Sequence, residues 1–292
     1  MARAPKSDAP GTQRILNNNV VIVVDDGGNE RVLMGAGLGF RLKTDSVLDL
    51  ELVEKSFVLE SKSDGDRART LLVDMPYEAV EAVMSAIEVA ERQLKKDLGR
   101  RLPLAVLDHM NYVIERVRTG LQMAVAPMPE LAILYPDEFA AATSMVESIG
   151  ASLGVKLPPE ECVFLTMHLL NTTRNQPDGT AAILLRRLQH IVVTVENGLG
   201  MTLDAGSADY ARFILHIQFL LQRLTSGSML RGSDSSFYQF AKHSYPRSFA
   251  VALAVQEYIA AATNQALTDE EVLYVTVHVE RLTSRGVGPS AA

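Results

Sequence analysis

The chain has 292 residues, which is enough for two or three ordinary domains. Apolar residues make up 47% of the chain and charged residues 22%, a balance that is typical of folded, soluble proteins and excludes disorder throughout. The formal net charge of −7 excludes a bulk attraction to nucleic acid or anionic lipid, so any RNA or DNA binding must depend on local geometry.

Three further features indicate a cytoplasmic protein. The sequence has no run of about 18 apolar residues that could form a membrane span. Its first residues, Met1–Asp8, lack the apolar segment of a signal peptide. Cys162 is the single cysteine, which excludes a disulfide framework, and we expect it to be a small core residue in a reducing compartment.

The first sixty residues have the pattern of a small β domain. We expect residues 1–13 to be a flexible tail and residues 14–60 to form the domain. Val20–Val24 and Arg31–Met34 are short apolar runs joined by a Gly-containing hairpin turn, and Lys55–Leu59 reads as another strand. A unit of this size buries little apolar surface, so it would gain stability by pairing with a second copy.

The remaining chain has helical periodicity. Residues 61–75 form a charged linker, and residues 76–173 and 180–285 are two helical domains separated by a turn at 175–179, with a second flexible tail at 286–292. The fold class is therefore multidomain: a small N-terminal antiparallel β domain and two similar all-α helical bundles. The expected helices span residues 76–94, 103–119, 136–153, 159–172, 181–199, 207–226, 246–263 and 268–284.

Four of the six histidines form two matched pairs, one pair in each helical domain. His109 and His216 are 107 residues apart, and each is followed seven residues later by an arginine. His168 and His278 are 110 residues apart, and each follows a Glu-Glu pair. Two near-equal offsets indicate a duplicated module, with one histidine on each of two helices. Histidine can carry phosphate on nitrogen, bind a metal or sense pH.

Other residues of the helical modules have structural interpretations. The arginines that follow the first histidine of each pair, Arg116 and Arg223, share its helix face and are candidate partners of a phosphoryl group. His190 and His243 do not recur in the other copy, so we expect ordinary structural roles for them. The four glutamates of the Glu-Glu pairs begin predicted helices, where carboxylates favour the helix dipole; they are Glu160, Glu161, Glu270 and Glu271.

The β domain contains a second informative cluster. Asn17–Asn19 precedes the first strong strand, and Met34–Phe40 has glycines at alternate positions. Glycine allows a partner to approach the backbone, the asparagine amides both donate and accept, and Phe40 offers a ring for stacking on an unpaired base. The alternative is a simple turn in which the glycines satisfy the backbone and Phe40 fills a core.

These motifs together resemble the BglG-type transcriptional antiterminators over nearly all of Arg14–Arg281. The β segments Arg14–Val21, Met34–Phe40 and Glu54–Leu59 resemble the co-antiterminator RNA-binding domain of that family. The two helical copies resemble its two phosphotransferase-system (PTS) regulation domains. The matching segments are Asp108–Arg116, Tyr135–Phe139 and His168 in the first copy, and Arg212–His216, Tyr245–Pro246, Glu271–Tyr274 and His278–Arg281 in the second.

The resemblance implies a function and its partners. A member of the family binds a hairpin in nascent mRNA as a dimer and prevents termination, so no enzymatic activity and no cofactor are implied. RNA contacts would come from Asn17, Asn19, Gly35, Gly37 and Phe40. The sugar-specific PTS enzyme II would phosphorylate His109 or His168 and switch the protein off, and the phosphocarrier protein HPr would phosphorylate His216 or His278 and switch it on.

One position departs from the family pattern and keeps an alternative open. The family often has arginine between the first two glycines, where this chain has Ala36. Residues 1–60 contain seven basic and nine acidic residues, so bulk charge does not compensate. A regulator with PTS modules and weakened or lost RNA binding is therefore the first alternative.

Two other classes receive less support from the sequence. A regulator that acts on DNA would need a helix-turn-helix or a nucleotide-binding loop, and the Gly-x-x-x-x-Gly-Lys pattern is missing. A metal enzyme would need a compact ligand set, but the sequence has no His-Glu-x-x-His motif and no cysteine pair.

Overall fold

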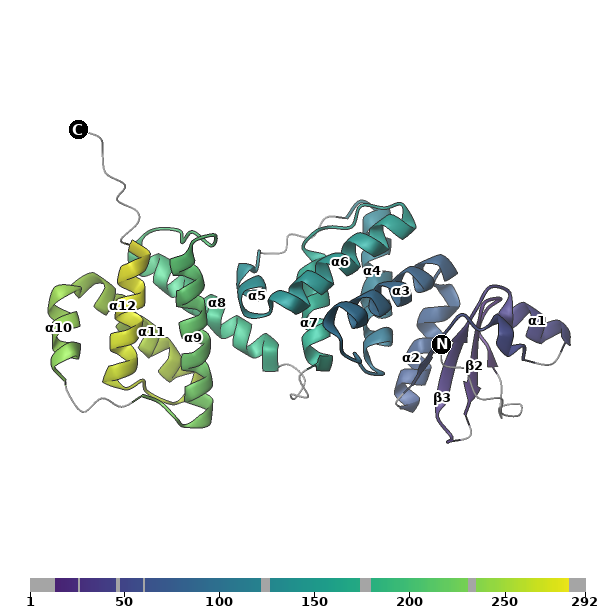
Figure 1. Cartoon of the computed structure of the whole chain (residues 1–292), viewed down its shortest axis with the longest axis horizontal. Coiled ribbons are helices and arrows are strands. Elements are labelled where there is room, and N and C mark those ends of the chain that lie inside the picture. Colours follow the sequence, from purple (N-terminus) through teal and green to yellow (C-terminus); the bar gives the residue numbers. More distant parts are fainter. Residues whose placement is uncertain are drawn as a thin grey trace. The chain divides into compact units, whose positions relative to one another are not determined.

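The computed structural model describes residues 14–25, 27–45, 48–59, 61–121, 127–173, 180–230 and 235–283. The tails expected at 1–13 and 286–292 and the turn expected at 175–179 lie outside the described residues. The chain folds as two compact units, Met1–Pro127 with Asp137–Gln176, and Met128–Pro136 with Pro177–Ala292. A small N-terminal antiparallel sheet is followed by helices, which confirms the predicted fold class (Figure 1).

The sheet of the first unit has four antiparallel strands in chain order, β1 to β4. Strand β2 pairs with β3 in a register that places Val20 opposite Met34 and Val24 opposite Glu30. The predicted hairpin turn forms between them, where the Asp25 carboxylate accepts hydrogen bonds from the backbone N–H groups of Gly27 and Asn29 at 3.0 and 2.9 Å. The strands are β1 (Arg14–Ile15), β2 (Val20–Val24), β3 (Glu30–Met34) and β4 (Lys55–Val58).

Both faces of this sheet are buried against the same chain. Alternate side chains of a strand point to opposite faces. One face, which includes Val21 and Leu33, packs against Leu38 and Leu42 of helix α1 (Leu38–Asp45). The other face belongs to a larger core that reaches the helical module, and its strand residues are Val20, Ile22, Val32, Met34 and Phe57. The apolar surface that suggested pairing with a second copy is therefore covered within one chain.

The interval 61–75, predicted to be a charged linker, forms helix α2 (Lys62–Asp74). Ser61 caps the helix by accepting a hydrogen bond from the backbone N–H of Asp64 at 3.1 Å. Ala68 and Leu72 are fully buried beneath the sheet face. Charged residues outnumber the few apolar residues that form the buried stripe of this helix. The sequence pattern therefore suggests a linker.

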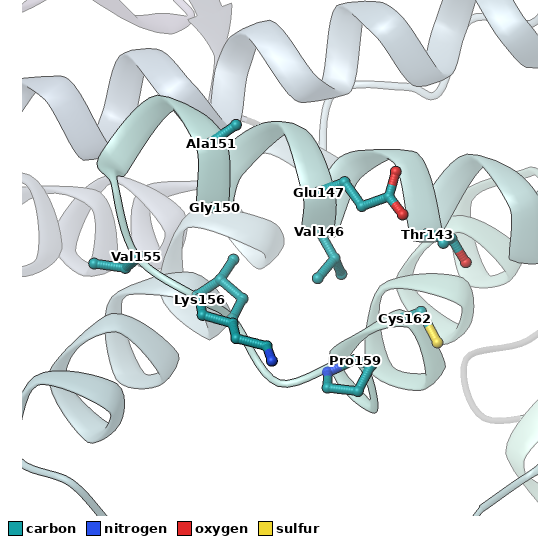
Figure 2. A pocket seen from close by; sticks show the side chains of 10 residues that line it. Thr143, Val146, Glu147, Gly150, Ala151, Val155, Lys156, Pro159 and Cys162 are labelled. Atoms are coloured by element: carbon teal, nitrogen blue, oxygen red, sulfur yellow. The ribbon is translucent and has the colours of Figure 1, made fainter.

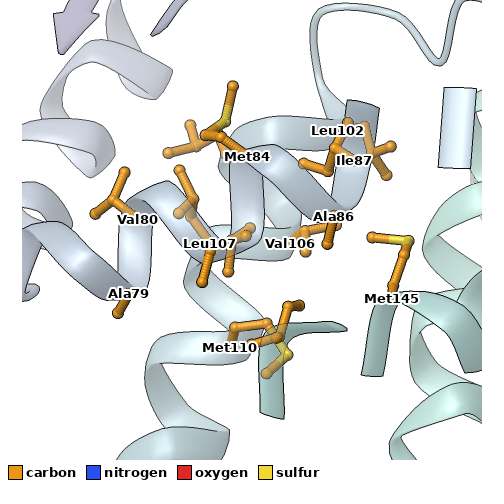
Figure 3. Packing of buried hydrophobic residues seen from close by; sticks show 14 of the residues in the cluster. Ala79, Val80, Met84, Ala86, Ile87, Leu102, Val106, Leu107, Met110 and Met145 are labelled. Carbon is orange, nitrogen blue, oxygen red and sulfur yellow. The ribbon is translucent and has the colours of Figure 1, made fainter. Parts of the chain in front are cut away.

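The four helices predicted for the first helical module are confirmed, with ends within about two residues. They are joined to α2 and the sheet by one continuous apolar core, part of which Figure 3 shows around Val80, Leu107, Met110 and Met145. A 3-10 turn, η1 (Leu50–Leu52), precedes β4. The helices are α3 (Tyr77–Leu94), α4 (Leu102–Arg118), α6 (Pro136–Leu153) and α7 (Glu161–Thr173).

The second unit repeats this arrangement and confirms the other four predicted helices. Helices α8 and α12 both pack on α11, and α9 packs against α12. Helix α9 begins at Ser207, whose hydroxyl accepts from the N–H of Tyr210, and ends at Gly227 in the left-handed conformation. The helices are α8 (Thr180–Leu199), α9 (Ala208–Ser226), α10 (Ser236–Ser244), α11 (Pro246–Thr263) and α12 (Asp269–Thr283).

Helix α5 (Pro129–Leu134) belongs to the second unit although it lies between α4 and α6 in sequence. It packs on α9 through the buried side chains of Leu131 and Leu134, and the Tyr210 hydroxyl donates a hydrogen bond to the buried Glu130. The sequence pattern predicts neither α5 nor α10, because six and nine residues are too few for a clear helical period.

No helix in the described ranges combines the length and the apolar character that crossing a bilayer requires.

The burial of α2 gives a stability prediction with a matched control. Leu72→Ala should lower the free energy of unfolding by about 2–5 kcal/mol, because Leu72 is fully buried and its loss leaves a cavity. Val73→Ala, one residue further on, should change it by less than about 0.5 kcal/mol, because Val73 is 48% exposed. Urea unfolding followed by circular dichroism measures both. Equal, near-neutral effects would show that the segment is a solvated linker.

Candidate functional sites

The asparagine segment and the glycine segment of the β domain lie side by side. The backbone carbonyl of Asn18 accepts hydrogen bonds from the N–H groups of Gly39 and Phe40 at 2.9 and 3.1 Å. The Asn19 side-chain oxygen accepts from the N–H of Gly37 at 2.8 Å. The structure therefore brings the two predicted segments together next to the start of α1, where Asn17, Asn19, Gly37 and Phe40 are at least partly exposed and Gly35 is buried.

Gly35 and Gly37, the two glycines predicted to contact RNA, are glycine for different structural reasons. A Cβ on Gly35 would lie 1.7 Å from the backbone oxygen of Leu52, so Gly35 is required by packing inside the domain. Gly37 has a φ of +72° and nothing within 4 Å of its Cβ position, which leaves its backbone open to a ligand. Of the two predicted contacts, the geometry supports Gly37 more strongly than Gly35.

The asparagine side chains also differ in their hydrogen bonds and exposure. The Asn17 amide donates to the backbone oxygen of Leu72 at 2.8 Å, and its oxygen accepts from the N–H groups of Asn19 and Val20. Asn17 therefore holds its own loop and attaches it to α2. The Asn19 amide nitrogen has no hydrogen-bond partner among the described residues, and Asn18, which the sequence analysis did not select, is exposed. The only sequence signal for Asn18 was its position between Asn17 and Asn19.

Phe40 lies on α1 and is 57% exposed, so the interpretation of this ring as a core residue is wrong. An exposed aromatic ring beside open backbone and amide groups is the arrangement that stacks on unpaired bases.

The first histidine pair lies between α4 and α7. The ring centroids of His109 and His168 are 5.5 Å apart. His109 Nε2 lies 2.8 Å from the Glu161 carboxylate, and Arg116 donates to the other oxygen of that carboxylate. Glu161 is fully buried and Arg116 is 4% exposed, so the two form a buried ion pair beside the histidines.

The second pair, between α9 and α12, has the same elements in a different arrangement. The rings of His216 and His278 stack with centroids 4.4 Å apart. Arg223 donates two hydrogen bonds to the buried Glu271 carboxylate, at 2.8 and 2.7 Å, and the N–H of Leu230 donates a third at 3.0 Å. His216 Nε2 is buried without a hydrogen-bond partner within the described part of the chain.

Burial controls the charge of these groups. Burial, with the charge of the neighbouring histidine in second place, lowers the pKa of both His168 and His216 to about 4. Burial also lowers the pKa of His278. For Glu161, burial alone would raise the pKa, but the hydrogen bonds and charges of His109 and Arg116 outweigh it and the pKa is lowered. His168 and His216 are therefore neutral near pH 7, and Glu161 is ionised.

Glu161 and Glu271 lie in the first turns of α7 and α12, as expected, but their carboxylates point into the helix pair and bind arginine instead of capping the helix. The arginines, considered as candidate phosphoryl partners, are paired with these glutamates in the same chain. The sequence carried a signal for this: the Glu-Glu pairs recur with the same offset as the histidines that follow them. Glutamate is common at helix starts, so only the repeat distinguishes these glutamates from ordinary first-turn carboxylates.

The remaining histidines have ordinary environments. His190 stacks on Tyr258 with ring centroids 3.9 Å apart, and the His243 ring contacts the backbone oxygen of Gln239 at 2.7 Å. Neither lies in a histidine pair, in agreement with the structural roles expected for them.

A pocket of about 330 Å³ lies between α6 and the start of α7 (Figure 2). Apolar side chains such as Val146 and Val155 line it, together with Pro159 and Cys162, and burial raises the pKa of the Cys162 thiol. None of the four paired histidines lines this pocket. Across the described ranges, no group of three or more His, Cys, Asp or Glu side chains is arranged to hold a metal ion.

Known proteins agree with this division into an RNA-binding and a histidine-bearing part. Residues 12–65 match the CAT RNA binding domain, and residues 84–172 and 189–282 each match the PRD domain. The chain is 32% identical to the transcription antiterminator LicT of Bacillus subtilis (strain 168), over 92% of this chain and 97% of LicT. The chain belongs to the BglG-type family of transcription antiterminators.

Other relatives within the antiterminator family are similar over comparable lengths. The beta-glucoside operon antiterminator of Dickeya chrysanthemi is 32% identical over 93% of this chain and 96% of that protein. The GlcT protein of Staphylococcus saprophyticus is 28% identical over 91% of this chain and 94% of its own length. A crystal structure of GlcT CAT-PRDI, 28% identical, matches 56% of this chain and 96% of that one with a TM-score of 0.49.

Titration of the PRD histidines gives a pH prediction. The folded-state pKa of His216 is about 4, below the value of 6.5 expected in the unfolded chain, so the unfolded state binds the proton more tightly. The stability that this group contributes is full above about pH 6.5 and is lost as the pH falls toward 4. His216→Gln should therefore flatten the slope of unfolding free energy between those values, a contribution of about 3 kcal/mol. Urea unfolding across this range tests it, and an unchanged slope would contradict the buried, neutral state.

Proposed function

We propose that this chain is a sugar-responsive transcriptional antiterminator of the cytoplasm that binds a hairpin in nascent mRNA as a dimer and prevents termination. Phosphorylation of its PRD histidines by the phosphotransferase system controls this activity, and the protein has no enzymatic role of its own. The observation that carries the proposal is the order of one CAT RNA binding domain and two PRD domains, with LicT similar from end to end.

The geometry supports an RNA surface made by the loop before β2, the glycine loop and the start of α1. Phe40 supplies an exposed ring for stacking, and the Asn19 amide nitrogen and the backbone around Gly37 supply polar groups. Asn17 supports this surface from behind through its bond to α2. A dimer doubles the surface, which matches the two sides of an RNA hairpin.

Each PRD pair offers a neutral imidazole, that of His168 in the first pair and of His216 in the second, and an imidazole accepts a phosphoryl group only when it is neutral. The proposed donors are the sugar-specific enzyme II for His109 or His168, which inactivates the protein, and HPr for His216 or His278, which activates it. A phosphoryl group adds roughly 1.5 to 2 negative charges, enough to rearrange a buried ion pair.

One observation favours the alternative of weakened RNA binding. Ala36 stands at the exposed tip of the glycine loop, and its backbone N–H lies 3.3 Å from the Glu54 carboxylate. An acidic group is thus placed where the family often has arginine. Ala36→Arg should strengthen binding to the leader RNA if a cation is missing there, and binding that is already tight in the native protein would reject this alternative.

Stacking by Phe40 gives a prediction with a matched control. Phe40→Ala should raise the Kd for the leader hairpin roughly 5- to 150-fold, the equivalent of about 1–3 kcal/mol per stacked base, with little change in stability. Phe57→Ala is the control, because Phe57 is 6% exposed and its loss should destabilise the domain. Fluorescence anisotropy with labelled hairpin and thermal unfolding separate the two effects. Native affinity in the Phe40 variant would remove the ring from the RNA surface.

The division of labour between the modules is tested with four single histidine variants. His216→Ala and His278→Ala should lower antitermination, since the activating phosphate is lost. His109→Ala should make antitermination independent of the inducing sugar, and His168→Ala should act in the same direction. A terminator-reporter assay measures this, and phosphate mapping after incubation with HPr and enzyme II identifies the modified residue. Identical behaviour of all four variants would contradict the proposed division.

A further inference from the structure

The two PRD sites differ at one nitrogen atom. In the first site, Nε2 of His109 lies 2.8 Å from the fully buried Glu161 carboxylate. In the second site, Nε2 of His216 is buried without a hydrogen-bond partner among the residues that the structure describes, and Glu271 binds Arg223 and the N–H of Leu230. The repeat therefore places the same residue types in both sites but uses the carboxylate differently.

This difference determines which nitrogen of the first histidine can react. The Glu161 carboxylate is ionised and can only accept a hydrogen bond, so Nε2 of His109 carries the hydrogen. A nitrogen that carries a hydrogen has no free lone pair and cannot attack phosphorus. Nε2 of His216 has no acceptor that fixes a hydrogen on it.

The two sites also differ in how the negative charge of a phosphoryl group would be accommodated. A phosphoryl group on Nε2 of His109 would take the place of the Glu161 carboxylate and bring roughly 1.5 to 2 negative charges to it. Arg116 supplies a single positive charge to both anions. Because Glu161 is on α7 and the other two residues are on α4, expelling the carboxylate breaks the polar link between these helices.

We infer that Glu161 is a positioning residue that keeps the hydrogen on Nε2 of His109, so that phosphorylation at this nitrogen has to expel Glu161 and separates α4 from α7, whereas phosphorylation of His216 leaves the Glu271–Arg223 link between α9 and α12 intact. The inference rests on the proposed control by histidine phosphorylation. It gives a physical reason for opposite responses of two modules with the same sequence pattern.

Phosphoramidate, a small phosphoryl donor, tests the inference without any protein partner. The imidazole nitrogen attacks phosphorus, the phosphorus–nitrogen bond of phosphoramidate breaks, and the nitrogen leaves as ammonia with the proton that the imidazole gives up. Labelling of each histidine in the full-length chain is followed by peptide mass spectrometry under conditions that preserve phosphohistidine, and phosphorus NMR identifies the nitrogen that is modified.

Glu161→Gln and Glu271→Gln form a matched pair, because each replaces a fully buried carboxylate that binds an arginine. Glu161→Gln should raise the rate of labelling at Nε2 of His109 roughly tenfold or more, the factor expected for one charge-assisted hydrogen bond, and leave His216 within about twofold. Glu271→Gln should leave the His216 rate within about twofold. Equal effects of the two variants would overturn the inference, as would a lower rate at His109, which would make Glu161 an activator of the opposite nitrogen.

Hydrogen exchange of the native chain supplies a test that needs no substitution. Label on Nε2 of His109 should increase amide exchange in α4 and α7, and label on His216 should leave the protection of α9 and α12 unchanged. Unchanged protection of α4 and α7 in the fraction labelled at Nε2 of His109 would overturn the inference even if a glutamine variant fails to fold.

The two proposals fail in distinguishable ways. If the native chain is labelled by phosphoramidate with the expected Glu161 dependence but never by HPr or enzyme II, the PTS control is wrong and the geometry of the site is right. If HPr and enzyme II label the chain but the Glu161 and Glu271 variants behave alike, the PTS control stands and the inference about Glu161 is wrong.

Discussion

The pairing of a buried glutamate with an arginine is the constraint on which each PRD module depends; Arg116 is itself buried, whereas Arg223 is 22% exposed. Glu161 joins Arg116 across α4 and α7, and Glu271 joins Arg223 across α9 and α12. Taking two charges out of water is costly, and removing one partner of such a pair leaves an uncompensated charge that costs about 3–5 kcal/mol. The two helices of each pair are therefore fixed in one register, and that register is what brings a histidine from each helix within ring contact of the other.

The same packing makes the histidines chemically competent. Burial lowers the pKa of His168 and His216 to about 4, so both rings are neutral near pH 7 and keep a lone pair on one nitrogen. The nitrogen that keeps it depends on the neighbour. In the first module the glutamate touches a histidine as well as the arginine, and in the second it binds the arginine and a backbone N–H instead. The different hydrogen-bond partners of the two carboxylates thus distinguish two sites whose sequence patterns are equivalent.

The sequence predicted most of the helical architecture, and its omissions have physical reasons. Eight long helices were predicted with nearly correct ends, because apolar periodicity and the repeat of about 110 residues support each other. Helix α2 was read as a linker since its buried residues, such as Leu72, are outnumbered by charges. The paired histidines followed from the repeat alone. The repeat marked Glu161 as recurring with the histidines, but its buried contact with Arg116 could not be predicted, because periodicity does not show which face of α7 meets α4.

Helix α2 gives the proposed RNA surface a physical connection to the first histidine site. Near its middle, Arg67 forms an ion pair with Asp108, the residue before His109 on α4. Near its end, the backbone oxygen of Leu72 holds the Asn17 amide beneath the RNA-binding loop. An α-helix resists stretching and bending over 13 residues, so a displacement of α4 that carries α2 with it also moves the support of Asn17. In this fold the helical module does not need to touch the RNA, because the loop that presents Asn19 and Phe40 is anchored to the helix that packs on α4.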